Sequence, residues 1–202
     1  MERVDSPHGL VVVGAASCAP LPGEVEHVAR LAEPRRREFL AGRAVLRAAL
    51  GRDVAILPDD RGAPVLPPGF VGSISHKGDV AAAIVAAAAG DGAHVGIDLE
   101  RAVEARQPIE RRILTAREQA AVRGREVTLA FAIKEAIYKA LDPFVRRYVG
   151  FTEVELDLAT RVVATALPFA IDIWWCEHAG YWLATARATR LAARPTDTSS
   201  FR

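Results

Sequence analysis

Short apolar blocks and one longer helical pattern occupy the first half of the chain. Residues 10–13 are a continuous apolar run with the length of a buried strand. Between Pro34 and Gly51, apolar residues such as Leu46 and Leu50 recur at helical spacing. Proline near the start of a helix and glycine just past its end are the usual boundary residues. This pattern predicts a strand followed by a helix.

Three further strands are expected after a turn-rich loop. The prolines and glycines of residues 58–69 forbid regular structure there. Residues 70–75, 80–88 and 94–100 are apolar stretches of strand length, and short polar or glycine-rich segments separate them. Their succession predicts an antiparallel meander.

The second half of the chain begins with two helical patterns. Thr115 followed by Glu118 is a capping-box signature for a helix that ends near residue 123. From residue 128 to 141 the apolar residues form one continuous stripe at helical spacing. Pro143 is expected to stop this helix. The polar residues expected to face away from the stripe are Lys134, Glu135, Tyr138 and Asp142.

Strand patterns complete the chain. They cover residues 154–158, 161–166, 171–177 and 181–187, with a turn expected at 178–180. The segment 194–202 has no core-forming pattern, so we expect it to be disordered. Strand, helix, strands, helices and strands in this order predict an α+β fold rather than a doubly wound parallel sheet.

Composition narrows the class of partner only slightly. Half of the 202 residues are apolar, which is enough for one sizeable core or for two small lobes. The 26 Lys and Arg residues balance 25 Asp and Glu residues, so global charge gives no reason to expect a nucleic-acid or membrane partner. No apolar run approaches the roughly 20 residues that span a bilayer.

The cysteines and the first apolar run suggest an intracellular protein. Cys18 and Cys176 have no spacing typical of a disulfide framework or a zinc site, and we interpret them as reduced thiols. The apolar run at residues 10–18 lacks the net-basic start of a signal peptide. We therefore expect a strand there and a cytoplasmic location.

Lysine is rare in this chain. Of the 26 cationic residues only Lys77, Lys134 and Lys139 are lysines, and the other 23 are arginines. A lysine is a compact point charge suited to phosphate oxygens, whereas arginine favours planar bidentate pairing. The positions of the lysines are therefore informative.

Asp98 and Glu100 are candidate metal ligands. Side chains alternate along a strand, so these two carboxylates in the segment VGIDLE share one face. Two like charges this close are unfavourable unless a cation neutralises them, and Mg²⁺ prefers oxygen ligands. The alternative is a pair of solvated acids on an edge strand.

A second cluster lies in the segment FAIKEAIYKAL. Glu135 and Lys139 are one helical turn apart, so they could form an ordinary surface ion pair. The use of two of three lysines here, at Lys134 and Lys139, instead favours an anion site beside a third acid.

A third cluster lies at the end of a predicted strand, and a separate arginine stripe lies on the first predicted helix. Ser75 and His76 end a predicted strand and could bind a phosphate or ribose, or His76 could be a structural residue. Adjacent side chains leave a strand in opposite directions, which argues against a Ser–His hydrolase. The arginine stripe of Arg36, Arg43 and Arg47 could equally be a solvated helix face.

Five segments in this order resemble the phosphopantetheinyl transferases of the Sfp-type class. That family carries a basic helix, a G-x-P loop, a GS-[IL]-[ST]-H strand end, a VGID-x-E strand and a [FW]-x-x-KEA-x-x-KA helix. The matching segments are residues 35–43, 61–64, 72–76, 95–100 and 131–140. The family often has tryptophan where this chain has Phe131, and the position of Leu99 varies in the family; neither departure removes a functional group.

The resemblance implies roles for the acids and lysines. Asp98, Glu100 and Glu135 would hold Mg²⁺, or Mn²⁺ in its place. Lys139 with Lys134 would contact the pyrophosphate of coenzyme A. Glu135 would accept the proton of the attacking serine, directly or through a metal-bound water.

It also implies a binding site for the nucleotide end of coenzyme A. Arg35, Arg43 and His76 would hold the 3′-phosphate. Ser75 and Arg61 would make further contacts.

The implied activity is transfer of the 4′-phosphopantetheine arm of coenzyme A to a serine of an apo carrier protein, which releases adenosine 3′,5′-bisphosphate. The implied architecture is a monomer with two pseudo-twofold lobes, here residues 1–100 and 101–193, and a coenzyme A cleft between them. The alternatives are a Mg²⁺-dependent phosphohydrolase or nucleotidyl transferase with the same acids, and a non-enzymatic nucleotide-binding or scaffold domain.

Overall fold

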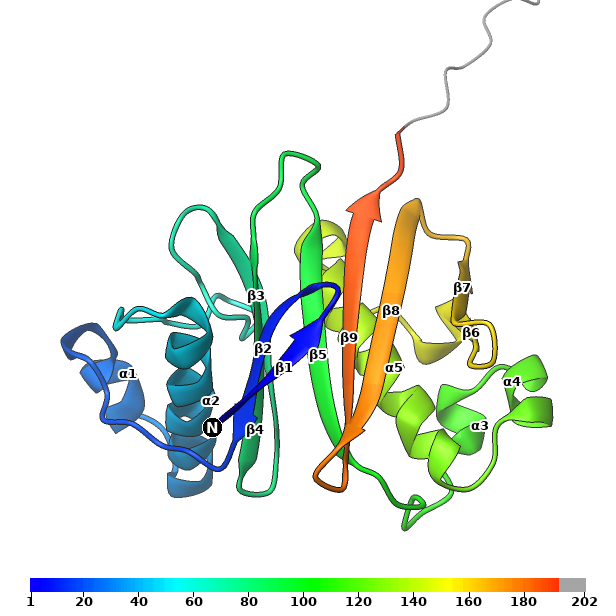
Figure 1. Cartoon of the computed structure of the whole chain (residues 1–202), viewed down its shortest axis with the longest axis horizontal. Coiled ribbons are helices and arrows are strands. Elements are labelled where there is room, and N and C mark those ends of the chain that lie inside the picture. Colours follow the sequence, from blue (N-terminus) through cyan, green and yellow to red (C-terminus); the bar gives the residue numbers. More distant parts are fainter. Residues whose placement is uncertain (193–202) are drawn as a thin grey trace, which may run out of the picture.

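The computed structural model describes residues 1–192. These residues fold around two main antiparallel sheets, each covered by one long helix (Figure 1). The first sheet has the strand order β1-β2-β4-β3. Its strands are β1 (Glu2–Ser6), β2 (Gly9–Gly14), β4 (Val80–Ala87) and β3 (Phe70–Lys77). The helix that packs on it is α2 (Glu33–Leu50).

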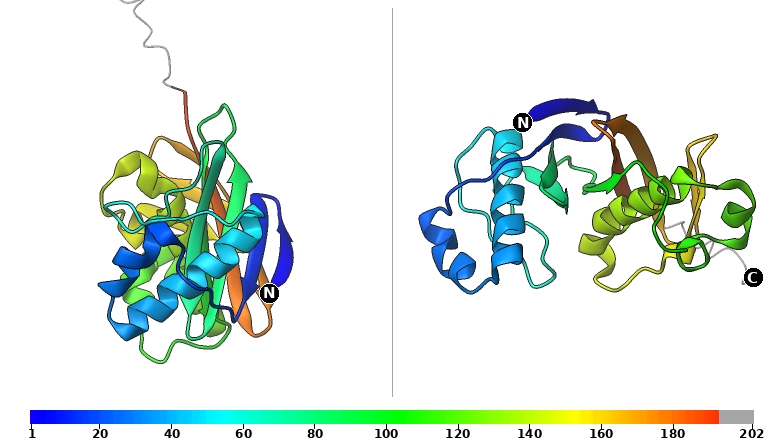
Figure 2. Two further views of the ribbon diagram at one scale, coloured as in Figure 1. Left: turned by 90° about the vertical axis from the view of Figure 1, so that its left-hand side faces the viewer. Right: turned by 90° about the horizontal axis from the view of Figure 1, so that it is seen from below.

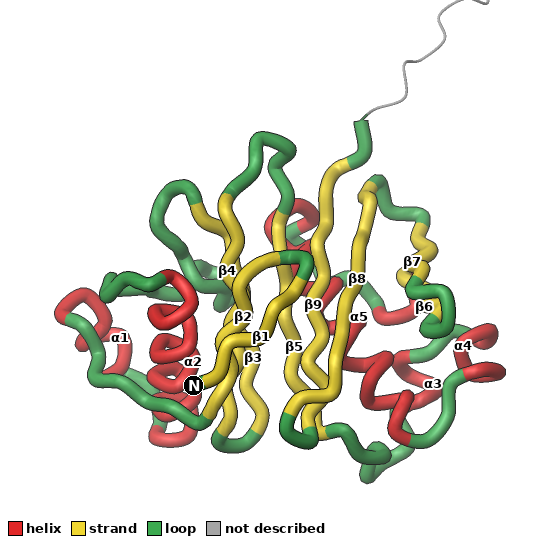
Figure 3. Tube along the Cα trace, in the orientation of Figure 1, coloured by secondary structure: helices red, strands yellow, loops and turns green. Residues whose placement is uncertain are grey.

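The second sheet has the order β5-β9-β8. Its strands are β5 (His94–Arg101), β9 (Tyr181–Arg190) and β8 (Phe169–His178). The helix α5 (Arg125–Val145) covers one face, and its predicted apolar stripe is buried there. Strands occupy the middle of the molecule and helices its two flanks (Figure 3).

Short elements complete the chain. They are η1 (Pro22–Glu24), α1 (Val25–Ala29), α3 (Glu110–Ile113), α4 (Ala116–Ala121), η2 (Phe151–Glu153), β6 (Val154–Asp157) and β7 (Val162–Thr165). The predicted capping box at α4 is present: Thr115 accepts from the backbone of Glu118, and the carboxylate of Glu118 accepts from the backbone of Thr115.

Because side chains alternate along the strands, the first sheet packs against α2 on one face and against the second sheet on the other. In the first sheet, Val12 and Ala83 face α2, while Val11 and Ile84 face the second sheet. They meet Ile97 of β5 in a core of their own between the sheets. The opposite face of β5 therefore turns toward α5 and carries Asp98 and Glu100.

β5 and α5 are in unusually close backbone contact. A Cβ atom on Gly96 would lie 2.0 Å from the carbonyl oxygen of Ala136 and 2.8 Å from the backbone nitrogen of Ala140. Only glycine permits this approach. The contact places the polar residues of α5 directly beside the carboxylates of β5.

The hairpin β1–β2 crosses from the first half to the second, on the side away from α2 and α5 (Figure 2). Its tip docks through buried His8, whose Nδ1 lies 2.8 Å from Oγ1 of Thr185 and whose Nε2 lies 3.2 Å from Oδ2 of Asp172. Oγ of Ser6 also lies 3.2 Å from Oγ1 of Thr185. The hairpin thus ties the two sheets together.

The α+β class is confirmed, but two local predictions were wrong. The meander is incorrect because β5 pairs with β9 and not with β4. Pro143 lies inside α5, in its last turn, where it lacks only the N–H that would reach the carbonyl of Lys139. Both β1 and α1 were missed.

Other predictions are left open. The pseudo-twofold relation and the lobe boundary at residue 100 stay predictions, and the tail from residue 194 lies outside the described residues. Among those described, no helix is long and apolar enough to cross a membrane.

Candidate functional site

A cleft of about 610 Å³ lies between the two halves. Residues of α2, of the loop 58–64, of β3 and of α5 line it. The cleft brings together five of the predicted site residues, Arg35, Arg43, Arg61, His76 and Lys139. One cavity thus collects cationic side chains that are far apart in sequence.

Arg43 is built into the floor of this cleft. It is only 5% exposed, its Nε donates to the carbonyl of Ile56 at 2.8 Å, and its guanidinium lies 4.0 Å from the ring centre of Phe39. Its Nη2 is buried and has no partner in the described part of the chain. Burial lowers the pKa of Arg43 to about 10, so it stays charged near neutral pH. A buried cationic donor without a partner suits an anionic ligand.

Two further residues of the cleft share one carboxylate. Nη1 of Arg35 donates to Oε2 of Glu38 at 2.8 Å, and Nε2 of His76 lies 3.6 Å from the same oxygen. All three side chains are at least partly exposed. An incoming phosphate would compete with Glu38 for both residues.

Arg61 closes the cleft from the loop side. Its Nε lies 2.8 Å from both carboxylate oxygens of Asp142 on α5, and its Nη2 lies 3.2 Å from the hydroxyl of Tyr138. This hydrogen-bonded ion pair raises the pKa of Arg61. Arg61 therefore holds the loop against α5 while it lines the cavity.

Beside the cleft, Asp98 is the most buried acid of β5. Its Oδ1 accepts from Ser75 Oγ and from Lys139 Nζ, both at 2.7 Å. Its Oδ2 is buried and finds no partner among the described residues. A buried carboxylate oxygen in this state is suited to a cation.

Glu100 and Glu135 complete an acidic cluster. Burial raises the pKa of Glu100, although Lys77 opposes this. Burial also raises the pKa of Glu135, and the charges of Asp98 and Glu100 add to that effect while Lys139 opposes it. The three carboxylates therefore act on one another electrostatically.

The donor atoms of the cluster suit a divalent cation, but the side chains are not arranged to enclose one. Its oxygens are the hard ligands that Mg²⁺ prefers. As the side chains lie, no three of the described His, Cys, Asp and Glu residues are arranged to hold a metal. In this arrangement Lys139 contacts one oxygen of Asp98, and Lys77 contacts Glu100.

The structure places Lys134 elsewhere than predicted. Its side chain is 1% exposed, and its Nζ contacts Oε2 of Glu118 at 2.7 Å and the carbonyls of Ile113, Phe151 and Val154 at 2.8–2.9 Å. An ammonium group has three protons to donate. Its hydrogen bonds are thus used within the protein, and Lys134 is corrected from a pyrophosphate contact to a structural residue.

The expected role of Ser75 also needs correction. Ser75 is buried, and its hydroxyl contacts Asp98 and the backbone N–H of Leu99, so it supports the acidic cluster rather than a ribose or phosphate.

The solvated-face alternative for the arginine stripe of α2 does not hold for Arg43 and Arg47, which are buried. Arg47 forms an ion pair with the buried Glu24.

Sequence reasoning gave Lys77 no role. Its amine lies 2.9 Å from Oε1 and 2.6 Å from Oε2 of Glu100. The signal that could have found it was lysine scarcity, because each of the three lysines pairs with a carboxylate. Phe39 and Tyr138 were also missed, since aromatic residues at helical spacing are mostly core.

Two protein-family models match the chain. A model of the 4′-phosphopantetheinyl transferase N-terminal domain matches residues 23–86, and a model of the 4′-phosphopantetheinyl transferase superfamily matches residues 94–190. The chain belongs to the 4′-phosphopantetheinyl transferase superfamily. This confirms the predicted family.

Individual phosphopantetheinyl transferases are also similar to it. The chain is 38% identical over 150 residues to the 4′-phosphopantetheinyl transferase Svp of Streptomyces mobaraensis, and 35% identical over 153 residues to Npt of Nocardia iowensis. It is 33% identical over 154 residues to PptT of Mycobacterium tuberculosis. These matches cover 67%, 67% and 70% of this chain and 59%, 64% and 66% of the respective relatives, so the chain spans less than two thirds of their length.

Proposed function

We propose that this phosphopantetheinyl transferase superfamily member moves the 4′-phosphopantetheine arm of coenzyme A onto a serine of an apo carrier protein. One observation carries the proposal: Lys139 lines the cationic cleft and also contacts Asp98 of the acidic cluster at 2.7 Å. A single amine thus joins a site suited to phosphates with a site suited to a cation.

The cleft would hold the nucleotide end of coenzyme A. Arg43 offers a buried donor, and Arg35 and His76 offer partly exposed nitrogen atoms in the same cleft, so these three are our candidates for the 3′-phosphate contacts. Arg61 would support the same end from the loop. The diphosphate would then reach Lys139 and the acidic cluster.

The reaction forms one bond and breaks another at the β-phosphorus. The serine oxygen attacks this phosphorus, the bond to the bridging oxygen breaks, and adenosine 3′,5′-bisphosphate leaves. Glu135 would accept the hydroxyl proton, because its carboxylate is half-buried, has no hydrogen-bond partner in the described residues and has a raised pKa. Lys139 would stabilise the charge that develops on the phosphate oxygens.

Asp98, Glu100 and Glu135 would hold a divalent cation, Mg²⁺ or Mn²⁺. Once bound, such a cation supplies charge stabilisation at the phosphate oxygens. The free Oδ2 of Asp98 is the oxygen best placed to ligate without breaking a contact.

Mass spectrometry of the carrier protein tests the activity. The protein is incubated with coenzyme A, Mg²⁺ and an apo carrier protein, and we expect a phosphopantetheinyl adduct in the intact mass of the carrier. A phosphohydrolase or nucleotidyl transferase would release phosphate or pyrophosphate without this adduct. Neither matched family model nor the relatives named above is of those kinds.

Substitutions in the cluster test the roles. We expect Asp98→Ala, Glu135→Ala and Lys139→Ala each to abolish adduct formation while circular dichroism shows a folded protein. Glu126→Ala is the matched control, because Glu126 is an exposed acid of the same helix without an ion pair in the described residues. A near-normal rate in any of the three variants would remove the role assigned to that residue. A monomeric state and a cytoplasmic location stay predictions.

A further inference from the structure

Lys77 links the two halves of the molecule at the acidic cluster. It lies at the end of β3, and its amine contacts both carboxylate oxygens of Glu100 on β5, at 2.9 and 2.6 Å. The side chain of Glu100 is 15% exposed and that of Lys77 is 43% exposed. The carboxylate of the pair is therefore partly shielded from solvent, while the amine stays accessible to it.

The two lysines of the cluster hold their acids differently. Lys139 contacts a single oxygen of Asp98 and leaves Oδ2 free. Lys77 contacts both oxygens of Glu100. A cation could reach Asp98 without displacing a lysine, but it could ligate Glu100 only by displacing Lys77 from at least one oxygen.

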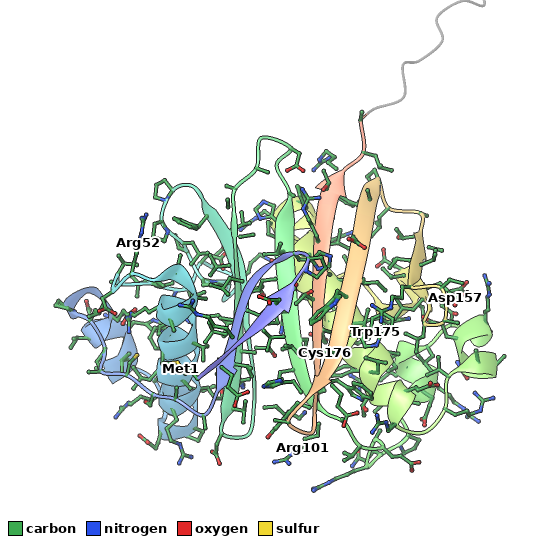
Figure 4. All side chains as sticks on the ribbon, viewed as in Figure 1. Met1, Arg52, Arg101, Asp157, Trp175 and Cys176 are labelled. Atoms are coloured by element: carbon green, nitrogen blue, oxygen red, sulfur yellow. The ribbon has the colours of Figure 1, made fainter. Side chains whose placement is uncertain are left out.

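If a cation displaces Lys77 from Glu100, the side chain of Lys77 has open space beside it. It lines a second groove of about 550 Å³, whose charged lining also includes Glu100, Glu104, Arg101, Arg106 and Arg112. None of these three arginines has an ion pair among the described residues. Arg101 marks the position of this groove at the end of β5 (Figure 4). The exposed amine can therefore turn toward solvent without leaving a buried charge.

We propose that Lys77 is a positioning residue that sets the affinity of the acidic cluster for a divalent cation by occupying Glu100. Its ammonium group is the counter-ion of Glu100, and a metal ion must displace it to ligate that carboxylate. The proposal rests on the proposed function only in taking the cluster to be a metal site. Removal of the resident charge leaves Glu100 free and spares the metal a repulsion at short range.

Metal titration of the apo-protein tests this directly. The Kd for Mn²⁺ is measured by isothermal titration calorimetry at pH 8. We expect Lys77→Met to lower the Kd by about three- to thirtyfold relative to wild type, which corresponds to about 0.6–2 kcal/mol. An unchanged or higher Kd would overturn the proposal and make Lys77 a mere support for the orientation of Glu100.

Three other variants sharpen the result. Lys77→Arg keeps the charge, so its Kd should stay within about threefold of wild type. Arg106→Gln removes a cation from the same groove that contacts no carboxylate, and an effect as large as that of Lys77→Met would assign the result to general electrostatics and overturn the contact argument. If thermal unfolding shows that Lys77→Met does not fold, Lys77→Gln, which is neutral but can still donate to Glu100, decides by the same criterion.

The two proposals fail separately. A lower Kd in Lys77→Met without any adduct on the carrier protein would uphold the role of Lys77 and reject the transferase. Adduct formation with an unchanged Kd would do the reverse.

Discussion

Arg43 is a buried cation that lines the cleft. Its stem packs in the first half of the molecule, one nitrogen donates to the carbonyl of Ile56, and Nη2 is buried without a partner among the described residues. A charged hydrogen bond is worth about 1.5–3 kcal/mol. The free nitrogen therefore has most to offer to a bound anion.

We expect Arg43→Ala to raise the KM for coenzyme A by about ten- to a hundredfold with a smaller effect on kcat, because the lost contact is remote from the reacting phosphorus. Steady-state kinetics of adduct formation measures both constants. Arg37→Ala is the control, since Arg37 is an exposed arginine of the same helix without an ion pair in the described chain. A wild-type KM in Arg43→Ala would leave Arg43 with only its packing role.

At the scale of residues, the sequence predicted the strand face of the two acids better than it predicted their partners. Strand alternation placed Asp98 and Glu100 on one face correctly. Their partners Ser75 and Lys77 come from β3, which lies beside β5 only in the folded molecule. Lys134 was misplaced for the same reason, because its counter-ion Glu118 lies on another helix.

Among the elements, β5 and α5 position the acidic cluster through the glycine contact between them. Gly96→Ala would force a methyl group against the backbone of Ala136. We expect a loss of about 3 kcal/mol or more in the free energy of unfolding, because backbone atoms cannot rotate away as a side chain can. Urea denaturation measures this loss.

The same substitution should impair activity beyond its effect on stability. A shift of α5 away from β5 lengthens the contact between Lys139 and Asp98, so the folded fraction of Gly96→Ala should be less active than wild type. Gly90→Ala is a suitable control, since no atom lies within 4 Å of a Cβ added there. Equal activity per folded molecule would show that the cluster tolerates movement of the helix.

The buried pair of Lys134 and Glu118 joins α5 to α4 and to β6. Glu118 caps α4, accepts from the backbone of Leu156 and pairs with Lys134. Removal of one partner from a buried ion pair costs about 3–5 kcal/mol.

Lys134→Met should therefore lose about 3–5 kcal/mol of stability in chemical denaturation while the folded protein keeps its KM for coenzyme A. Lys139→Met should show the opposite pattern, with little loss of stability and no transfer. A raised KM in a fully stable Lys134→Met would restore the pyrophosphate role that the structure denies it.

Element types were predictable because they depend on local periodicity, and most predicted helices and strands are present. The pairing partners of the strands were not predictable from local periodicity. The segment after β4 begins a second sheet because β9, more than 80 residues later, pairs with β5 over its whole length. No local pattern in residues 88–94 distinguishes a hairpin from a change of sheet.

For the whole molecule, the β1–β2 hairpin is the feature that joins the two sheets on the side away from the cleft. Its anchor His8 is buried between Thr185 and Asp172, with Arg187 nearby. Burial lowers the pKa of His8, Arg187 adds to this, and Asp172 opposes it. The folded state thus favours the neutral imidazole.

This predicts a loss of stability in mild acid. Below the ordinary histidine pKa of about 6.5 the unfolded chain binds a proton that the folded state resists, so stability falls as pH decreases from 7 to 5. The slope contributed by one histidine is at most about 1.4 kcal/mol per pH unit. Chemical denaturation at several pH values should give a shallower slope for His8→Asn than for wild type.

His94 needs a parallel measurement, because burial lowers its pKa as well. The comparison of His8→Asn with His94→Asn separates the two contributions. An identical slope in wild type and His8→Asn would show that the hairpin anchor does not respond to pH in this range.

Because lysine is scarce in this chain, chemical labelling of amines reports on a few defined positions. The chain has three ε-amines, and each is engaged with a carboxylate in the described structure. An amine-directed reagent would reach Lys134 only when the protein unfolds, whereas its reaction with Lys77 and Lys139 would follow events at the acidic cluster. A peptide mass map of such labelling would therefore record global opening and site occupancy together, from the natural chain and without any introduced probe.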